Sequence, residues 1–183
     1  MLLLLLVGFA ACGRTVKNDV YTAVYAKADI TGLDGSLKGR IGFNHLENVV
    51  GIQIVFDLDG GCSQKTYGIY ISEYGTTGEK CADVGYHFTT NMNNHGAADA
   101  KMRHLGDIGK FKTDVEGKVQ RVIKDYEITL SGEHSIIGRA VVITEEPGDD
   151  GLGKTSMSKF NGNMGKPVAC AIIGYAREQI VLE

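Results

Sequence analysis

The sequence has little proline, no excess of positive charge and no hydrophobic run long enough to span a bilayer. Only 2 of its 183 residues are Pro, whereas 25 are Gly. This indicates tight turns between short strands, because Gly adopts positive φ without steric cost. The net charge of −3 argues against a nucleic-acid partner, since polyanion binding needs a basic excess. The apolar run at residues 1–11 is much shorter than the ~20 residues that cross a bilayer, so no membrane span is expected.

The apolar N-terminal run resembles the hydrophobic region of a secretory signal. It reads MLLLLLVGFAA without a charge, and its last residues, Ala10 and Ala11, are small as in a cleavage zone. We therefore predict a signal peptide over residues 1–12, a mature domain over residues 13–183, and secretion. Two alternatives are a buried N-terminal segment and a bacterial lipoprotein leader ending at Cys12, although Phe9 stands where that leader has an aliphatic residue.

Short β-branched and aromatic runs separated by Gly-rich turns make up most of the remaining chain. They predict eight strands, at residues 20–25, 40–47, 49–57, 67–74, 107–114, 118–125, 138–144 and 168–174. No stretch shows sustained helical periodicity, and residues 75–103 and 145–165 form two long irregular segments. The pattern predicts an all-β fold, an antiparallel sandwich or barrel.

The first irregular segment concentrates histidines. His87, His95 and His104 lie within eighteen residues of one another, and Asp107 follows. Three imidazoles and one carboxylate make a closed four-coordinate set that suits Zn²⁺. A loop without its own core can be held by such a metal, which replaces buried apolar contacts. The alternative for any one of these histidines is a solvated side chain.

Several motifs resemble those of copper/zinc superoxide dismutases. They are Gly85-Tyr86-His87-Phe88, Asn94-His95-Gly96-Ala97, Arg103-His104-Leu105-Gly106-Asp107, Leu130-Ser131-Gly132-Glu133-His134-Ser135-Ile136-Ile137-Gly138-Arg139 and the segment from Gly162-Asn163 to Cys170. The spacings of eight, nine and three residues between His87, His95, His104 and Asp107 match that family's zinc loop. The resemblance implies an eight-stranded antiparallel Greek-key β-barrel with a zinc loop and an electrostatic-type loop. It also implies one zinc per chain.

The positions that correspond to the family's copper ligands depart from its pattern. Tyr70 and Ser72 stand where the family has the two His of a Gly-x-His-x-His strand, and Thr144 stands at the late His position. Only His87, at the bridging position, is retained. The family's guiding Arg is replaced by Pro167. Hydroxyl groups are poor ligands for Cu(I), so we expect no copper and no catalytic residues.

The resemblance also assigns roles to residues around the site. It implies a disulfide between Cys81 and Cys170, which leaves Cys62 as a thiol that we expect to be buried and inert. It implies that Asp149 or Asp150 accepts a hydrogen bond from His95 and braces it.

Further expectations concern His87, His45, His134 and Ile137. We expect the non-zinc nitrogen of His87 to bond to the hydroxyl of Tyr70, Ser72 or Thr144, or to water. His45 and His134 are interpreted as structural. Ile137 lies where family dimers pack, so a homodimer is plausible.

Two classes of function are compatible with these residues. The first is a secreted, zinc-binding, copper-less relative that acts by binding or regulating a partner, such as a true dismutase or its metal chaperone, including as a heterodimer. The alternative is a superoxide dismutase-type oxidoreductase with weak activity from copper in a rearranged site, where a Tyr70 phenolate would ligate the oxidised metal.

Overall fold

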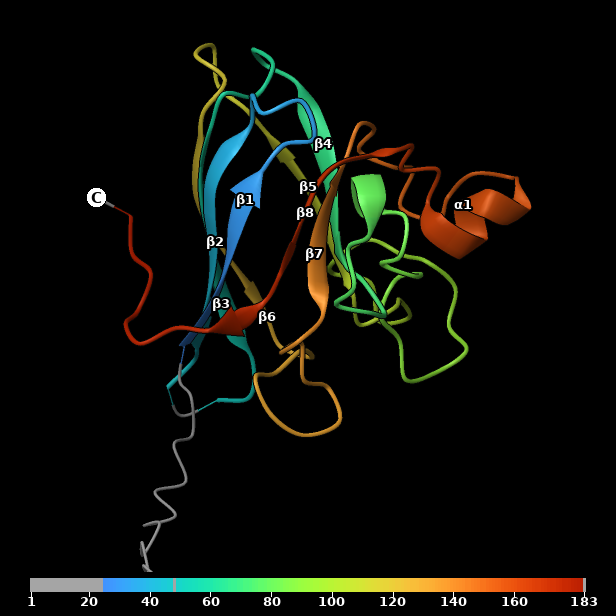
Figure 1. The fold of residues 1–183 in the computed structure, drawn as a ribbon. Coiled ribbons are helices and arrows are strands. Elements are labelled where there is room, and N and C mark those ends of the chain that lie inside the picture. The colour runs from blue at the N-terminus through green and yellow to red at the C-terminus, as the bar shows by residue number, and fades with distance from the viewer. Residues whose placement is uncertain (1–24, 48, 183) are drawn as a thin grey trace, which may run out of the picture.

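Two antiparallel sheets face each other in the computed structural model, which describes residues 25–47 and 49–182 (Figure 1). The first sheet has the order β6-β3-β2-β1-β9 and the second the order β5-β4-β7-β8. The strands of the first sheet are β1 (Tyr25–Thr31), β2 (Lys38–His45), β3 (Ile52–Asp59), β6 (Val119–Asp125) and β9 (Gly174–Tyr175). Those of the second are β4 (Thr66–Ile71), β5 (Asp107–Lys112), β7 (Ala140–Thr144) and β8 (Pro167–Ile172). The chain thus leaves the first sheet after β3 and returns to it as β6, beside β3.

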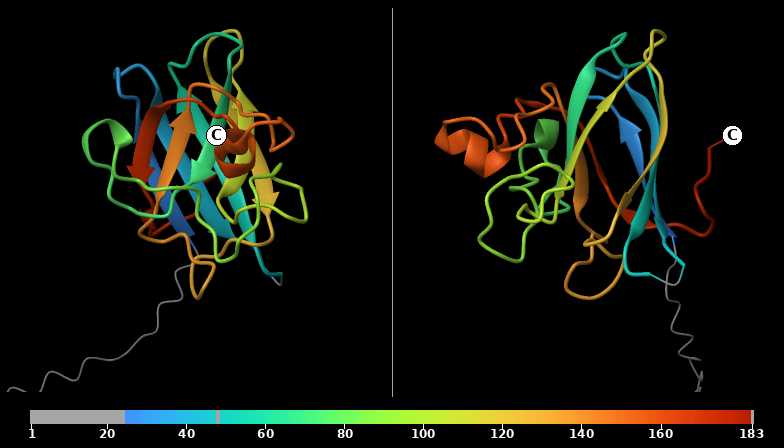
Figure 2. Two further views of the ribbon diagram at one scale, coloured as in Figure 1. Left: turned by 90° about the vertical axis from the view of Figure 1, so that its right-hand side faces the viewer. Right: turned by 180° about the vertical axis from the view of Figure 1, so that it is seen from behind.

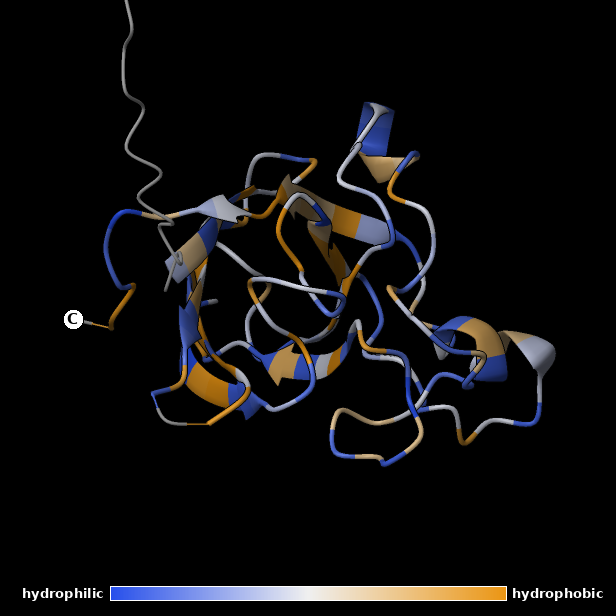
Figure 3. Ribbon diagram, turned by 90° about the horizontal axis from the view of Figure 1, so that it is seen from below, coloured by the Kyte–Doolittle hydropathy of each residue, from blue (hydrophilic) through white to orange (hydrophobic). Residues whose placement is uncertain are grey.

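The core lies between the sheets because alternate residues of each strand point inward. On β3, Ile52, Ile54 and Phe56 are buried in the core cluster. Phe56 meets Phe111 of β5, with ring centroids 5.6 Å apart, so the two sheets touch through aromatic side chains. Viewed from below, hydrophobic and hydrophilic residues alternate along the strands around this interior (Figure 3).

The predicted all-β architecture is confirmed, with differences at the strand ends. The prediction began the third strand at Val49, but Val49 and Val50 are 53% and 68% exposed, and β3 begins at Ile52. The chain turns before it, at Gly51, whose φ of +134° favours glycine. A ninth strand, β9, adds a two-residue pairing to β1. The predicted signal peptide at 1–12 and most of the predicted strand at 20–25 lie outside the described residues.

The prediction that residues 145–165 are wholly irregular is wrong at one point. A short helix, α1 (Ser156–Asn161), begins after Thr155, whose side chain accepts a hydrogen bond from the Ser158 N–H. It ends at Gly162, which has a left-handed conformation. Six residues are too few to produce a recognisable helical pattern. The other irregular segment contains a 3₁₀ turn, η1 (Glu79–Cys81). No helix among the described residues has the length and apolar character needed to cross a membrane.

The structure contains the expected disulfide, but Cys62 does not lie in the expected environment. Cys81 and Cys170 form a disulfide, which joins residues 89 positions apart and ties η1 to β8. Cys62 is exposed, so the expectation of a buried, inert thiol is wrong. It lies in the loop between β3 and β4, where its backbone binds neighbouring groups: its N–H donates to the Tyr67 hydroxyl and its carbonyl accepts from Thr113.

Removing the disulfide should destabilise the fold strongly. Cys170→Ser should lower the free energy of unfolding by about 4 to 5 kcal/mol, because the unfolded chain regains the entropy of a loop of this length. Urea unfolding under oxidising conditions measures the change. Cys62→Ser is the matched control and should leave stability unchanged. Equal stability of Cys170→Ser and Cys62→Ser would contradict the prediction.

Candidate metal centre

The loop between β4 and β5 and the loop between β7 and β8 lie side by side on the outer side of the second sheet (Figures 1 and 2). Backbone hydrogen bonds attach the first loop to β4: the Phe88 N–H donates to the Ile71 carbonyl, and the Ile71 N–H donates to the Gly106 carbonyl. A Cβ at position 106 would overlap the Ile71 carbonyl, so only glycine allows this approach. His87 forms an isolated β-bridge with Ser72, and Asp107 begins β5.

Four buried side chains converge where these segments meet. The Nδ1 atoms of His87, His95 and His104 lie 2.7, 2.9 and 3.4 Å from Oδ1 of Asp107. The other carboxylate oxygen, Oδ2, accepts hydrogen bonds from the backbone N–H groups of Gly96 and His104. One ligand atom from each of the four residues lies within 4.8 Å of all the others, so the group could hold a metal ion. The structure therefore brings together all four residues singled out in the sequence.

The environment favours an ionised carboxylate of Asp107 and a neutral imidazole of His87. Burial alone would raise the pKa of Asp107, which is 1% exposed, but hydrogen bonds from His104, His87 and His95 outweigh it and hold that pKa well below its ordinary value. Burial lowers the pKa of His87 despite the opposite effect of Asp107. Ionised carboxylate and neutral imidazole are the forms that bind metals.

The donor set is incompletely satisfied without a cation. Nδ1 of His104 is buried and has no hydrogen-bond partner, because Oδ1 of Asp107 already accepts from His87 and His95. A tetrahedral Zn²⁺ with bonds of ~2.0–2.1 Å would separate its ligand atoms by about 3.3 Å. This value lies between the shortest distance in the cluster, 2.7 Å from Oδ1 to His87, and the 4.8 Å within which all four ligand atoms lie. The residues present therefore fit a tetrahedral ion with nitrogen and oxygen ligands.

The three positions that correspond to copper ligands carry no comparable donor set. The Tyr70 ring stacks on the His87 imidazole, with centroids 4.0 Å apart and planes 14° apart. Burial raises the pKa of Tyr70 to about 12. The Ser72 hydroxyl lies within hydrogen-bonding distance of the Tyr74 and Ala140 carbonyls, and the Thr144 hydroxyl donates to the Glu146 carbonyl. None of these hydroxyls forms the expected bond to His87, because the backbone engages two of them and Tyr70 presents its ring face. The alternative partner named for the non-zinc nitrogen of His87, a water molecule, stays a prediction. None of the three residues places an imidazole at these positions.

The acidic pair of the second loop has partners other than His95. Asp149 accepts hydrogen bonds from Ser158, Asn163 and the Gly151 N–H, and Asp150 pairs with Lys110 of β5 at 2.7 Å. Other residues of the second loop contact His95. The His95 N–H donates to the Lys159 carbonyl, and a Cβ at Gly162 would overlap the His95 ring. Close packing thus joins α1 to the cluster.

Arg103 and Asp125 support the loop and were not recognised as a pair in the sequence. The buried guanidinium of Arg103 pairs with Asp125 at the end of β6, at 2.7 Å. Its Nη1 lies 3.0, 3.1 and 3.3 Å from the carbonyls of His104, Leu105 and Asp107. Arg103 therefore fixes the backbone that carries two of the four cluster residues. The only signal in the sequence is its position next to His104.

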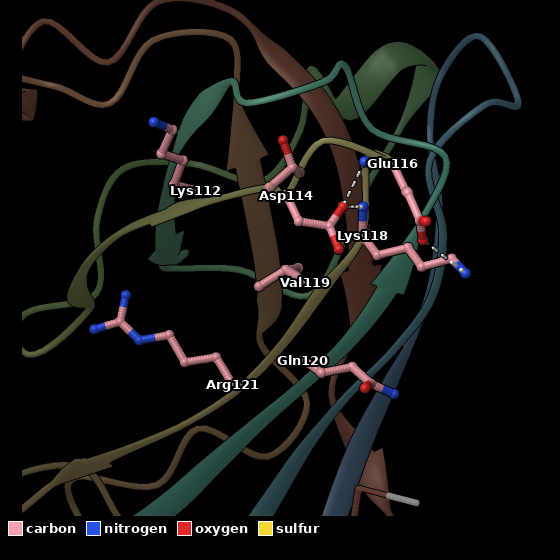
Figure 4. A pocket seen from close by; sticks show the side chains of 8 residues that line it. Lys112, Asp114, Glu116, Lys118, Val119, Gln120 and Arg121 are labelled. Carbon is pink, nitrogen blue, oxygen red and sulfur yellow. Dashed lines mark hydrogen bonds and ion pairs between the residues drawn. The ribbon is translucent and has the colours of Figure 1, made fainter.

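The remaining histidines and the hollow between β5 and β6 lie apart from the cluster. His45 is exposed at the end of β2, and Nδ1 of His134 lies 2.8 Å from the Glu127 carbonyl. A hollow of about 610 Å³ at the turn between β5 and β6 shares no residue with the cluster (Figure 4). Its charges are engaged locally, since Asp114 accepts from the Glu116 and Lys118 N–H groups. It has no role in metal binding.

Fold and cluster together define a metal-binding protein built on a β-sandwich. The chain belongs to the copper/zinc superoxide dismutase family, since residues 37–173 match the family described as "Copper/zinc superoxide dismutase (SODC)".

Known relatives agree with this assignment. The chain is 36% identical over 149 residues to a superoxide dismutase [Cu-Zn] of Paramecium bursaria Chlorella virus 1, covering 81% of this chain and 79% of the relative. It is 32% identical over 181 residues to an extracellular superoxide dismutase [Cu-Zn] of Caenorhabditis elegans, covering 97% and 79%. A solved structure titled as that of the clock protein EA4 superposes with a TM-score of 0.80 at 31% identity, over 85% of this chain and 96% of the other.

Breaking the Arg103–Asp125 pair should destabilise the protein. Arg103→Met should lower the free energy of unfolding by about 3–5 kcal/mol, because the carboxylate of Asp125 stays buried without its partner. The double variant Arg103→Met/Asp125→Asn should recover part of that loss, because it removes the unpaired charge. Urea unfolding of both variants and of Asp125→Asn completes a double-mutant cycle. Strictly additive losses would contradict a direct interaction.

Proposed function

We propose that this chain is a zinc-binding member of its family that has lost copper-dependent dismutation and acts through a protein partner. The observation that carries the proposal is the contrast between the two halves of the site. Four convergent ligands, His87, His95, His104 and Asp107, surround one point, whereas an aromatic ring covers the adjacent face of His87. A bound zinc would supply a redox-inert link between the four ligands.

Asp107 and His104 would contribute to holding that ion in different ways. Asp107 supplies the charged oxygen and, through its second oxygen, orders the backbone at Gly96 and His104. His104 is oriented by its other nitrogen, which lies 2.9 Å from the Asn93 carbonyl. A bond of this kind fixes the tautomer and leaves Nδ1 free for the metal.

The proposed loss of copper rests on what surrounds His87. Tyr70 belongs to a small apolar cluster with Val84, Val142 and Met164, beside the disulfide. A Cβ at Gly68, two residues earlier on β4, would overlap Met164, so the second loop covers this part of the sheet closely. Apolar packing of this kind offers no ligands to a copper ion.

Zinc binding is expected at one ion per chain. His104→Ala should abolish the zinc-dependent rise in melting temperature, because a ligand that binds only the native state stabilises it by about 2.7 kcal/mol at a free concentration of 100 times Kd. Elemental analysis and thermal unfolding with and without zinc measure this. His134→Ala, outside the cluster, should retain the full effect. Purified protein without zinc that also fails to bind added zinc would contradict the assignment.

Copper binding and dismutation should both be absent from the natural chain. After copper loading, we expect no stoichiometric copper, no absorption band of a multi-imidazole site and no superoxide dismutation above the level of free copper. The triple variant Tyr70→His/Ser72→His/Thr144→His is the positive control and should recover copper binding, because His87 and the strands are in place. Copper-dependent activity of the natural chain would overturn the proposal.

The second candidate is an active dismutase. It is favoured by the relatives of 32% and 36% identity that are named superoxide dismutases. The copper-loading experiment separates it from the first candidate.

The proposal also includes a protein partner and secretion of the chain. The chain would form a homodimer or a heterodimer with a dismutase-family protein. The heterodimer would place it against a true dismutase, and the metal chaperone of such a dismutase is the other candidate partner. Secretion is supported by the extracellular relative and by the disulfide, which forms readily in oxidising compartments. Size-exclusion chromatography of the chain with and without a dismutase subunit tests the partner.

A further inference from the structure

The outer face of the first sheet carries residues that are buried although they point away from the core. On β2, Ile41 and Phe43 belong to the core cluster, yet the intervening Gly42 and the following Asn44 are also buried. Asn44 is only 1% exposed. Alternation along a half-buried strand predicts exposure at these positions. Val55 of β3, the register partner of Gly42, is likewise 1% exposed and lies outside the core clusters.

The C-terminal segment covers this face. After β9 the Ala176 N–H donates to the Tyr25 carbonyl, and residues 177–182 then run along the outside of the sheet (Figure 2, right). A Cβ at position 42 would overlap the side chain of Ile180. Gly42 therefore leaves a notch into which Ile180 fits.

Asn44 binds the backbone of the same residue. Its Nδ2 donates to the Ile180 carbonyl at 2.7 Å, and its Oδ1 accepts from the Ile180 N–H at 3.2 Å. Gln53 of β3 holds the carboxamide through a contact of 3.3 Å from Nδ2. The carboxamide thus satisfies both backbone groups of one extended residue, as a neighbouring strand would.

We propose that Gly42, Asn44 and Val55 form a peptide-binding notch for one apolar residue with extended backbone, and that residues 177–182 occupy it as a strap. The strap holds β9 against β1, with which β9 shares a pairing of only two residues at the edge of the sheet. No part of this depends on the metal cluster.

The occupant is the chain's own segment. The sheet order β2-β1-β9 places the notch two strands from the start of the strap, about 10 Å away at ~4.8 Å per strand. Five residues from Tyr175 to Ile180 span up to about 17 Å when extended, so the segment reaches the notch without strain.

Hydrogen exchange of the C-terminal peptide in the full chain tests the strap. Ile180→Asp should raise exchange of this peptide roughly tenfold or more. The variant loses the packing of the Ile180 side chain over Gly42, and release of the segment then breaks both backbone hydrogen bonds to Asn44. Val181→Asp is the matched control, because Val181 is 56% exposed and the charge change is the same. Gly42→Ala should act like Ile180→Asp, whereas Gly174→Ala, where an added Cβ meets nothing within 4 Å, should not.

Three results would overturn the proposal. One is a natural chain whose C-terminal amides exchange at unprotected rates. Another is equal exchange in Ile180→Asp and Val181→Asp. The third is protection that appears only at high protein concentration together with a dimer on size-exclusion chromatography, since the notch would then hold the segment of a second copy.

Discussion

The buried carboxylate of Asp107 is the interaction on which the metal loop depends. One of its oxygens meets three imidazoles and the other accepts two backbone N–H groups. This carboxylate is the one group of the cluster that contacts all three imidazoles, so it is the common point at which His87, His95 and His104 meet. Because the carboxylate is charged and desolvated, positive charge nearby would stabilise it, and a metal held by the four residues would provide that charge.

The region on the other face of His87 is stabilised by different interactions. Around the other face of His87, aromatic stacking and apolar packing replace metal ligation. Dispersion and burial stabilise this region without any ion, whereas the zinc half leaves a buried nitrogen of His104 unpaired until an ion is present. The four-residue cluster and the apolar cluster around Tyr70 thus meet at His87, one on each side of its imidazole.

Sequence spacing was enough to find the four cluster residues, because consecutive ligands sit on one loop at characteristic intervals. The sheets were predictable from alternation, except where an apolar pair at Val49 and Val50 precedes the turn at Gly51. Contacts between segments that are far apart in the sequence could not be predicted from it. The pairing of Arg103 with Asp125, the stacking of Tyr70 on His87 and the fit of Ile180 over Gly42 depend on tertiary placement. The exposure of Cys62 also depends on how its loop packs.

The contact between Gly162 and His95 links the two loops in a way that constrains how the sequence can vary. Gly162 ends α1 in a left-handed conformation, and the space its side chain would need is filled by the imidazole. A larger residue at 162 is therefore compatible only with a smaller residue at 95. A chain that keeps the histidine at 95 in this position is therefore expected to keep the glycine at 162, and a change at one position is expected to require a change at the other.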